Sequence, residues 1–430
     1  MRVRLSVLLL LLLTVTFANP AYSQTATLRE IRTDGLKILT EPQAVALSGL
    51  TTGSQVGRKE LQDAADALVR CGLFAKVNYN FSTRSDGVAV TFHLEENPRL
   101  PVFYDNFPWY ADSELNDAIH NDLPYFDGTL PAAGEVVDLA GTSLQKFLAA
   151  KGMNATVEHL VIASPLSDGS IQQFRIDGAT PQIASLEFSD PQLTSSPAVQ
   201  QHLSEILNKP YSRMTIDVFL SEQIRPIYQQ NGNLKATIGP PEVRLSGNPN
   251  QKFPDRIPVY VPSQPGPVYH WKDATWTGNK VLSTITLTNE LGLKTGDVAN
   301  GMTLEGGWDR IREEYGHQGY LEAKLDPVAT YDDSQHTVSY AVSVSEGRQY
   351  HYNTMTVSGL SLAAERILRD AWPIKPGEIF DKKVFDQLLT NLELHHQAVF
   401  KDLPLHYETV GHWLQTDPSQ GAVDVLLDFK

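Results

Sequence analysis

One repeated pattern decides the fold of this chain: Arg70-Cys71-Gly72-Leu73-Phe74, Ala150-Lys151-Gly152-Met153-Asn154, Gln230-Asn231-Gly232-Asn233-Leu234 and His317-Gln318-Gly319-Tyr320-Leu321. In each copy a glycine separates the expected end of a helix from an extended run. Successive glycines lie roughly 80 residues apart, and a glycine-free copy at His396-Gln397-Ala398-Val399-Phe400 continues the spacing. The pattern predicts five units of similar length after an N-terminal leader.

The segment before each glycine has the pattern of an amphipathic helix. In the first unit Leu61, Ala64 and Leu68 fall on one helical face. Glycine suits the position after a helix because it adopts the left-handed conformation without a Cβ penalty. We therefore expect a helix to end at each glycine, and we expect Pro226 to kink or shorten the third one.

Two strands are expected after each glycine. In the first unit Val90, Phe92 and Leu94 alternate with small or polar residues, and the turn Ser85-Asp86-Gly87 precedes them. Each unit also opens with a short strand, which ends at a turn glycine such as Gly35 or Gly359. This order predicts an α+β fold: a tandem array of five small β-α-α-β-β domains, each a three-stranded mixed sheet covered by two helices.

The expected boundaries divide the chain into a leader and five units: residues 1–23, 24–98, 99–178, 179–267, 268–347 and 348–430. The third unit departs most from the plan, because eight prolines fall between Gly239 and Val268 and proline cannot donate to a strand ladder. We expect an enlarged loop between its last two strands and a stiff junction to the fourth unit. A plain interdomain linker is the alternative.

The leader has the features of an export signal. Arg2 and Arg4 precede an apolar run over residues 5–15, and Ala21-Tyr22-Ser23 resembles a small-x-small cleavage site. Because the apolar run is short for a membrane span, cleavage after Ser23 is the favoured interpretation and a retained anchor the alternative. No further membrane helix is expected.

Composition excludes several classes of function. The chain has 35 Lys and Arg against 50 Asp and Glu, a formal net charge of -15, without the basic cluster that nucleic-acid binding needs. A single cysteine, Cys71, rules out an intramolecular disulfide and a cysteine-based zinc site, and is expected to be a small buried apolar residue. No nucleophile elbow, phosphate loop or metalloprotease motif is present, so we expect no enzyme and no cofactor.

Three other features have a structural and a functional interpretation. The pair His395-His396 lacks a third metal ligand at a suitable spacing, so no metal is expected. The acidic pair Glu95-Glu96 is expected to be a solvated strand end. The aromatic residues at the start of the second unit are either a binding patch or, more simply, core residues: Phe103, Tyr104, Phe107, Trp109 and Tyr110.

Two phrases at unit boundaries carry a resemblance to a known family. They are Val90-Thr91-Phe92-His93-Leu94-Glu95-Glu96-Asn97-Pro98 and Val342-Ser343-Val344-Ser345-Glu346-Gly347-Arg348-Gln349-Tyr350, the second leading into Met355-Thr356-Val357-Ser358-Gly359. With the order of elements, they resemble the POTRA repeat of the periplasmic arm of the outer-membrane assembly factor BamA and its relatives. The resemblance is strong in units one, four and five and weaker in units two and three.

The resemblance implies a binding scaffold in the periplasm of a Gram-negative-type bacterium, associated with the outer membrane, that takes part in outer-membrane protein assembly or secretion. Its partners would be unfolded outer-membrane clients, with a separate β-barrel or envelope lipoproteins as further partners. Family members continue into a membrane barrel, whereas no such succession of strands is recognised before Lys430. The chain is therefore either a barrel-less array or part of something longer.

In this family the exposed sheet edge is the strand after the second helix, which can accept an extended peptide as an added strand. Here that strand corresponds to residues 75–81 and 321–327. The candidate binding residues are Lys76, Val77, Asn78, Tyr79, Leu321, Glu322, Ala323 and Lys324. A structural or cell-division scaffold with a retained N-terminal anchor is the alternative function, and a periplasmic hydrolase or carbohydrate binder is a third.

Overall fold

The computed structural model describes residues 25–164, 167–245, 253–393 and 409–430. The expected signal peptide, the glycine-free copy of the pattern and His395-His396 lie outside these residues. The chain separates into two compact units. Of the described residues, the first contains those up to Pro181 together with Pro210–Met214 and residues 253–255, and the second contains the rest.

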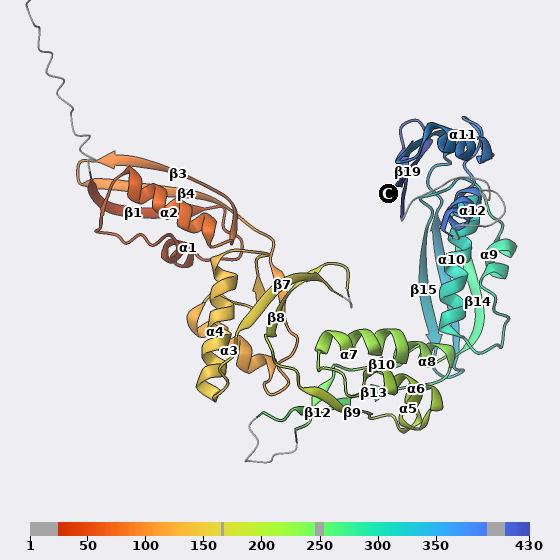
Figure 1. Cartoon of the computed structure of the whole chain (residues 1–430), viewed down its shortest axis with the longest axis horizontal. Helices are drawn as coiled ribbons and strands as arrows, with labels where there is room; N and C mark the ends of the chain where they lie inside the picture. The colour runs from red at the N-terminus through yellow and green to blue at the C-terminus, as the bar shows by residue number, and fades with distance from the viewer. Residues whose placement is uncertain (1–24, 165–166, 246–252, 394–408) are drawn as a thin grey trace, which may run out of the picture. The chain divides into compact units, whose positions relative to one another are not determined.

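The first group of elements in unit 1 forms a mixed sheet with two helices on one face (Figure 1). Its sheet has the order β2-β1-β4-β3, in which β1 and β4 are parallel and β3 and β4 antiparallel. Helix α2 buries Leu61, Ala64 and Leu68 against the sheet, as their spacing predicts. The elements are β1 (Ala26–Asp34), α1 (Glu41–Ser48), β2 (Gln55–Val56), α2 (Arg58–Arg70), β3 (Phe74–Arg84) and β4 (Gly87–Glu96).

The second group in unit 1 repeats this arrangement with the order β6-β5-β8-β7. Strands β5 and β8 are parallel and β7 and β8 antiparallel. Helices α3 and α4 are its two long helices. The elements are β5 (Leu100–Tyr104), α3 (Asp112–Asp122), β6 (Thr129–Leu130), α4 (Glu135–Lys151), β7 (Val157–Ala163) and β8 (Ser170–Ile176).

Both sheets of unit 1 have four strands where three are expected. The extra strand in each is two residues long and comes from the connection between the two helices. In the first sheet the Leu28 N–H donates to the Ser54 carbonyl oxygen at 2.8 Å, and the Gly53 N–H donates to the Leu28 carbonyl oxygen at 2.7 Å. The connection between the helices thus supplies hydrogen-bond partners for backbone groups of the first strand that would otherwise have none within the sheet.

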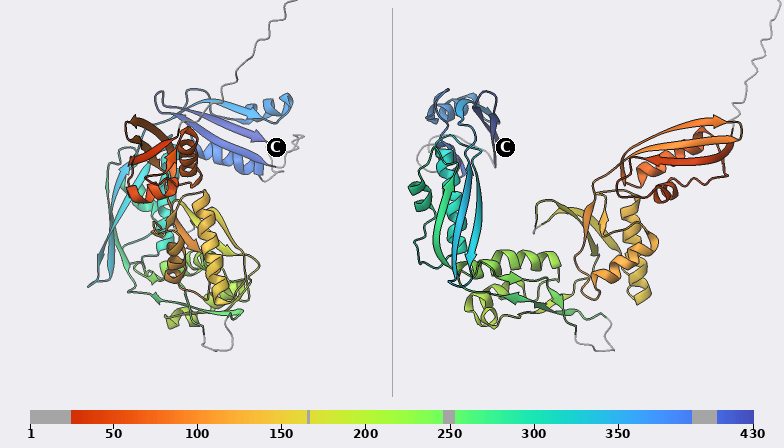
Figure 2. Two further views of the ribbon diagram at one scale, coloured as in Figure 1. Left: turned by 90° about the vertical axis from the view of Figure 1, so that its left-hand side faces the viewer. Right: turned by 180° about the vertical axis from the view of Figure 1, so that it is seen from behind.

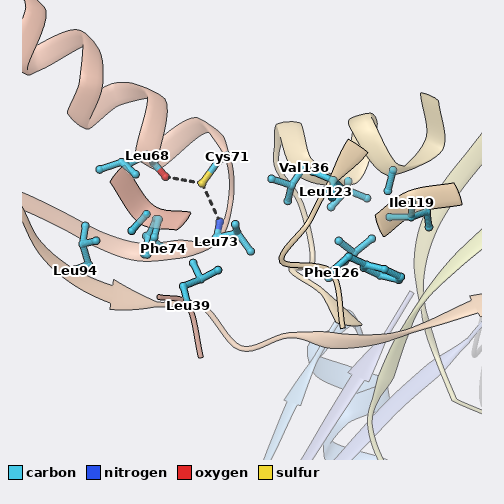
Figure 3. Packing of buried hydrophobic residues seen from close by; sticks show 14 of the residues in the cluster. Leu39, Leu68, Cys71, Leu73, Phe74, Leu94, Ile119, Leu123, Phe126 and Val136 are labelled. Carbon is cyan, nitrogen blue, oxygen red and sulfur yellow. Dashed lines mark hydrogen bonds between the residues drawn. The ribbon is translucent and has the colours of Figure 1, made fainter. Parts of the chain in front are cut away.

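One apolar core runs through both groups of unit 1. Figure 3 shows Leu68, Cys71 and Leu73 of the first group near Leu123, Phe126 and Val136 of the second. At this joint the Val136 N–H donates to the Cys71 carbonyl oxygen at 3.4 Å, and Arg70 pairs with Glu135 at 3.0 Å. Cys71 is buried, as expected, and burial raises the pKa of its thiol.

Unit 2 begins with a group that departs most from the repeat, as expected for the third unit. Three segments form one continuous helical run, which belongs to unit 2 from Thr215 onward: α7 (Arg213–Phe219), a π-helical stretch η1 (Leu220–Ile224) and α8 (Arg225–Gln230). Pro226 lies in the first turn of α8. Pro226 was expected to kink this helix or to end it early. The early end was wrong, because a π-helical stretch precedes the proline and the helical run continues to Gln230. The kink stays a prediction.

The proline-rich segment of this group contributes short strands to two small sheets. Their orders are β11-β12-β9 and β10-β13. The pairing of β12 with β9 shifts register between Ile257 and Pro258, where β9 has one extra residue, Ala184. The elements outside the helical run are β9 (Gln182–Phe188), α5 (Pro191–Ser195), α6 (Pro197–Ile206), β10 (Thr237–Ile238), β11 (Glu242–Val243), β12 (Arg256–Val261) and β13 (Ser263–Gln264).

Two further groups follow, each with a three-stranded mixed sheet. The orders are β14-β16-β15 and β17-β19-β18, and α10 lies along the sheet formed by β14, β15 and β16 (Figures 1 and 2). Each group has its own apolar core. The elements are β14 (His270–Thr277), α9 (Thr284–Glu290), α10 (Gly301–His317), β15 (Lys324–Asp332), β16 (Thr337–Ser345), β17 (His351–Ser358), α11 (Leu362–Ala371), α12 (Lys382–Glu393), β18 (Val410–Asp417) and β19 (Ala422–Phe429).

The glycines of the repeated pattern end their helices as predicted. Gly72, Gly152, Gly232 and Gly319 have φ of 85°, 98°, 77° and 81°, all left-handed. Two of them also join neighbouring groups, because the carbonyl oxygens of Gly232 and Gly319 accept from the N–H groups of Tyr269 and Tyr350 at 2.9 and 2.8 Å. Both tyrosines are fully buried. The mixture of helices with parallel and antiparallel strands confirms the α+β class.

The phrases that carry the family resemblance have a structural role. The Glu96 carboxylate accepts from the N–H groups of Ile38 and Leu39, each at 2.9 Å. Glu346 does the same for Lys280 and Val281, at 2.6 and 2.8 Å. The expectation of a purely solvated end at Glu95-Glu96 was therefore wrong for Glu96, which fastens the last strand to the turn before the first helix.

Candidate peptide-binding edges

Four sheets place the strand that follows the second helix at an edge. In the part of the chain that the structure describes, β3, β7, β15 and β18 each pair with one other strand. Such a strand presents every second residue's N–H and C=O groups away from the sheet. These are the groups that an extended guest segment would use.

Strand β3 contains four of the predicted site residues. It is eleven residues long, and its pairing with β4 is regular from Lys76 to Arg84. Val77 and Tyr79 lie opposite Leu94 and Phe92 on the core side, while Lys76 and Asn78 lie on the other side and are exposed. The prediction thus falls on a strand that offers a long, regular edge.

The residues of β3 whose backbone faces outward can be assigned from its turn. Arg84 and Gly87 pair across the two-residue turn Ser85–Asp86. In a two-residue hairpin this flanking pair is hydrogen-bonded, so alternate residues counted back from Arg84 face β4. Val77, Tyr79, Phe81 and Thr83 therefore direct their backbone groups outward.

An apolar strip accompanies this edge. Tyr79 packs on Phe92 with ring centroids 5.9 Å apart, and its hydroxyl lies 3.4 Å from the Gln62 side chain of α2. Phe81 continues the same side of β3 and is 44% exposed. Val69 lies seven residues after Gln62, on the same face of α2, and is 54% exposed. A guest strand beside β3 would thus meet apolar side chains on its core side.

The open face of the same sheet is occupied by polar side chains that bond one another. His93 Nδ1 lies 2.8 Å from an Asp34 oxygen, and its Nε2 lies 3.0 Å from Asn80. Glu30 pairs with Arg32 and Arg84, and its hydrogen bond with Arg32 lowers the pKa of the Glu30 carboxyl. Because these groups satisfy each other, the strand edge is the better place for a guest.

The second predicted segment lies only partly in a strand. Lys324 begins β15, whereas Leu321, Glu322 and Ala323 precede it. The Ala323 N–H donates to the Tyr320 carbonyl oxygen at 3.3 Å, which forms a turn there. The expected strand start at Leu321 was therefore wrong by three residues, because the chain turns once more after Gly319 before it extends.

Two edges were not among the predicted site residues. Strand β7 follows Gly152, so the spacing that located β3 could have found it, and its Leu160 is 62% exposed. Strand β18 carries Trp413, which is 56% exposed and lies opposite Leu426. Since β18 follows the glycine-free copy, the glycine signal was missing there.

The aromatic residues at the start of the second group contribute to packing. Tyr104 and Phe107 are buried in an edge-to-face pair, and Tyr110 packs on Phe147 with centroids 4.9 Å apart. Within the described ranges, no three His, Cys, Asp or Glu residues come together in a way that could hold a metal ion. Over the same ranges, none of the helices has the length and apolar character to cross a membrane.

Comparison with known proteins finds the POTRA family model, described as a surface antigen variable number repeat, over residues 269–347. These residues hold β14, α9, α10, β15 and β16. A candidate outer membrane protein assembly factor of Treponema pallidum (strain Nichols) is 27% identical over 127 residues, which are 30% of this chain and 15% of that protein. The match thus spans a small part of the relative's length.

Among solved structures, POTRA domains 3–5 of BamA from Haemophilus influenzae are similar at 22% identity, covering 58% of this chain and 96% of that one with a TM-score of 0.47. POTRA domains 1–3 of Omp85 from Anabaena cover 75% and 96% at 14% identity, with a TM-score of 0.20. The family match coincides with the phrase ending at Glu346 and Gly347. The resemblance to the POTRA repeat is therefore confirmed, and this chain carries a POTRA domain at residues 269–347.

Proposed function

We propose that this chain is a periplasmic scaffold that holds extended segments of unfolded outer-membrane proteins during their assembly or secretion. The observation that carries the proposal is the edge of β3. This strand is eleven residues long, pairs with β4 alone among the residues that the structure describes, and has an apolar strip along its core side. Main-chain bonds to such an edge do not depend on the guest's sequence, so one edge serves many clients.

The family match and the Treponema relative support the setting of this proposal. A POTRA domain at residues 269–347 and a stretch similar to an assembly factor both associate the chain with proteins of the bacterial envelope. We further propose that the predicted five-unit division holds, with the repeat junctions at the glycines of the pattern. In this proposal the other edge strands add binding sites to that of β3, for clients or for envelope partners.

Phe81→Pro tests the role of β3. It removes one outward N–H from the edge, whereas the matched variant Phe81→Ala removes the side chain and keeps the donor. The probe is a fluorescent ten-residue peptide of alternating apolar and polar residues. We expect Phe81→Pro to weaken its binding about tenfold, because one main-chain hydrogen bond is lost and the proline ring clashes with the peptide. Phe81→Ala should cost less than about threefold.

Fluorescence anisotropy on the full chain measures both affinities, and circular dichroism checks that each variant is folded. Equal affinities for the wild type and Phe81→Pro would contradict binding at this edge. A larger loss for Phe81→Ala than for Phe81→Pro would show that side-chain contacts, and not strand addition, hold the peptide.

A further inference from the structure

The edge strands differ in one residue type that matters for strand addition. Neither β3 nor β7 nor β18 contains a proline, whereas β15 carries Pro327 near its middle. Proline has no N–H and carries a ring carbon in its place, so at an edge it can interfere with a neighbouring strand. The question is whether Pro327 points its backbone at β16 or away from the sheet.

The pairing of β15 answers this question. Nine consecutive residues of β15, from Lys324 to Asp332, pair with β16 without a register shift. A proline whose nitrogen faced β16 would remove a ladder bond, and prolines inside sheets accordingly occur with the N–H position facing away. Pro327 therefore belongs to the outward set, which by alternation includes Leu325, Ala329 and Tyr331.

A guest strand would meet different chemistry at the two edges. Along β3 the outward residues Val77, Tyr79, Phe81 and Thr83 all carry a donor. Along β15 one donor is missing at the centre, and the pyrrolidine ring lies where the guest backbone would approach. The outward N–H groups of Leu325 and Ala329 flank Pro327. A regular guest strand that paired with both of them would contact the proline ring.

We propose that Pro327 closes β15 to added strands, so that peptide addition in this chain is confined to edges without proline, β3 foremost. The proposal rests on the proposed function, because it concerns which edge a guest uses. The predicted segment 321–327 would then include the residue that blocks strand addition at β15. Val328 on this strand is 56% exposed. An unblocked edge beside such exposed apolar residues would favour association between chains, and the proline opposes it.

Disulfide trapping on the full chain tests this proposal. Ser82→Cys and Thr330→Cys place a thiol at matched exposed positions, each two residues before the last paired residue of its strand, Arg84 or Asp332. The probe is a synthetic ten-residue peptide of alternating apolar and polar residues with one central cysteine. Cys71 gives little background because it is buried and the pKa of its thiol is raised.

We expect the peptide to be trapped at Ser82→Cys and only weakly at Thr330→Cys. Adding Pro327→Ala to Thr330→Cys should raise trapping about fivefold or more, because the edge regains a donor and loses the ring. Pro327→Val serves as a second variant, since a β-branched residue favours the strand. Val328→Ala is the control, because it alters the same exposed strand while Pro327 remains, and it should leave trapping unchanged.

Unchanged trapping at Thr330→Cys in both proline variants, with Ser82→Cys still reactive, would overturn the role of Pro327 and leave the proposed function intact. Equal trapping at both positions with Pro327 present would overturn it as well. Absence of trapping at every position, with folded variants, would instead overturn the proposed function itself.

Discussion

At the scale of single residues, the carboxylates of Glu96 and Glu346 each connect the end of a repeat's last strand to the segment before its first helix. Glu346 accepts from the N–H groups of Lys280 and Val281 and, at 3.1 Å, from the Tyr315 hydroxyl. Its removal takes the acceptor away from three donors, of which the Tyr315 hydroxyl belongs to a fully buried residue. We expect Glu346→Ala to lower the free energy of unfolding of this group by about 2 kcal/mol.

Denaturant unfolding followed by the fluorescence of the group's tryptophans measures this loss. The control is Glu313→Ala, an exposed residue of α10, the helix that carries Tyr315, and it should cost less than about 0.5 kcal/mol. Similar losses for the two variants would contradict the structural role of Glu346.

Tyr125 gives unit 1 a dependence on alkaline pH. Burial, with a smaller contribution from Cys71, raises the pKa of Tyr125 from 10.0 to about 12. The folded state therefore favours the neutral phenol, and its contribution to stability is complete below pH 10 and lost as the pH rises toward 12. We expect the wild type to lose unfolding free energy relative to Tyr125→Phe as the pH rises over this range.

Comparing the two proteins removes the effect of other buried tyrosines, because they are common to both. Urea unfolding at several pH values between 9 and about 12 provides the measurement. A difference that stays constant across the range would show that the Tyr125 hydroxyl ionises as freely in the folded state as in the unfolded chain.

The sequence predicted residues whose role is local and missed those whose partners are distant. The glycines of the pattern could be assigned to left-handed helix ends because the helix and the turn are adjacent in the chain. The partners of Glu96, Ile38 and Leu39, are more than fifty residues away, as are those of Glu346. No local pattern shows that such a carboxylate would meet those N–H groups.

At the scale of elements, regular periodicity was the reliable guide. The apolar face of α2 and the alternation in β4 predicted a helix and a half-buried strand, and both are present. The two-residue strands β2 and β6 were missed, because pairs this short have no period of their own and form only through backbone bonds to the first strand. The early helix end expected at Pro226 was wrong for a related reason, because a π-helical turn leaves no pattern in the sequence.

The candidate site was predicted in part for the same reasons. Lys76, Val77, Asn78 and Tyr79 lie on an edge strand because β3 follows its glycine directly. Leu321, Glu322 and Ala323 do not, because one extra turn separates Gly319 from β15. An edge is also a property of the assembled sheet, so the sequence could suggest that β3 is a strand but only the strand order shows that it pairs on one side.

At the scale of the whole molecule, neighbouring groups within each compact unit are joined by backbone hydrogen bonds or by shared apolar packing. In unit 1 a single core continues from α2 to α4, with Cys71 at the joint. In unit 2 the buried residues Tyr269 and Tyr350 each begin a group and bond to the glycine that ended the helix of the preceding one. The compact units that result each contain more than one group.

The central claim is that an extended guest adds to β3, and hydrogen exchange of the full chain tests it most directly. Exchange is followed with and without the alternating ten-residue peptide at saturating concentration. We predict slower exchange in segments that cover Phe74–Arg84, where the outward amides of Val77, Tyr79, Phe81 and Thr83 gain acceptors, and no change across Lys324–Asp332. Binding that leaves the exchange of β3 unchanged would contradict the account.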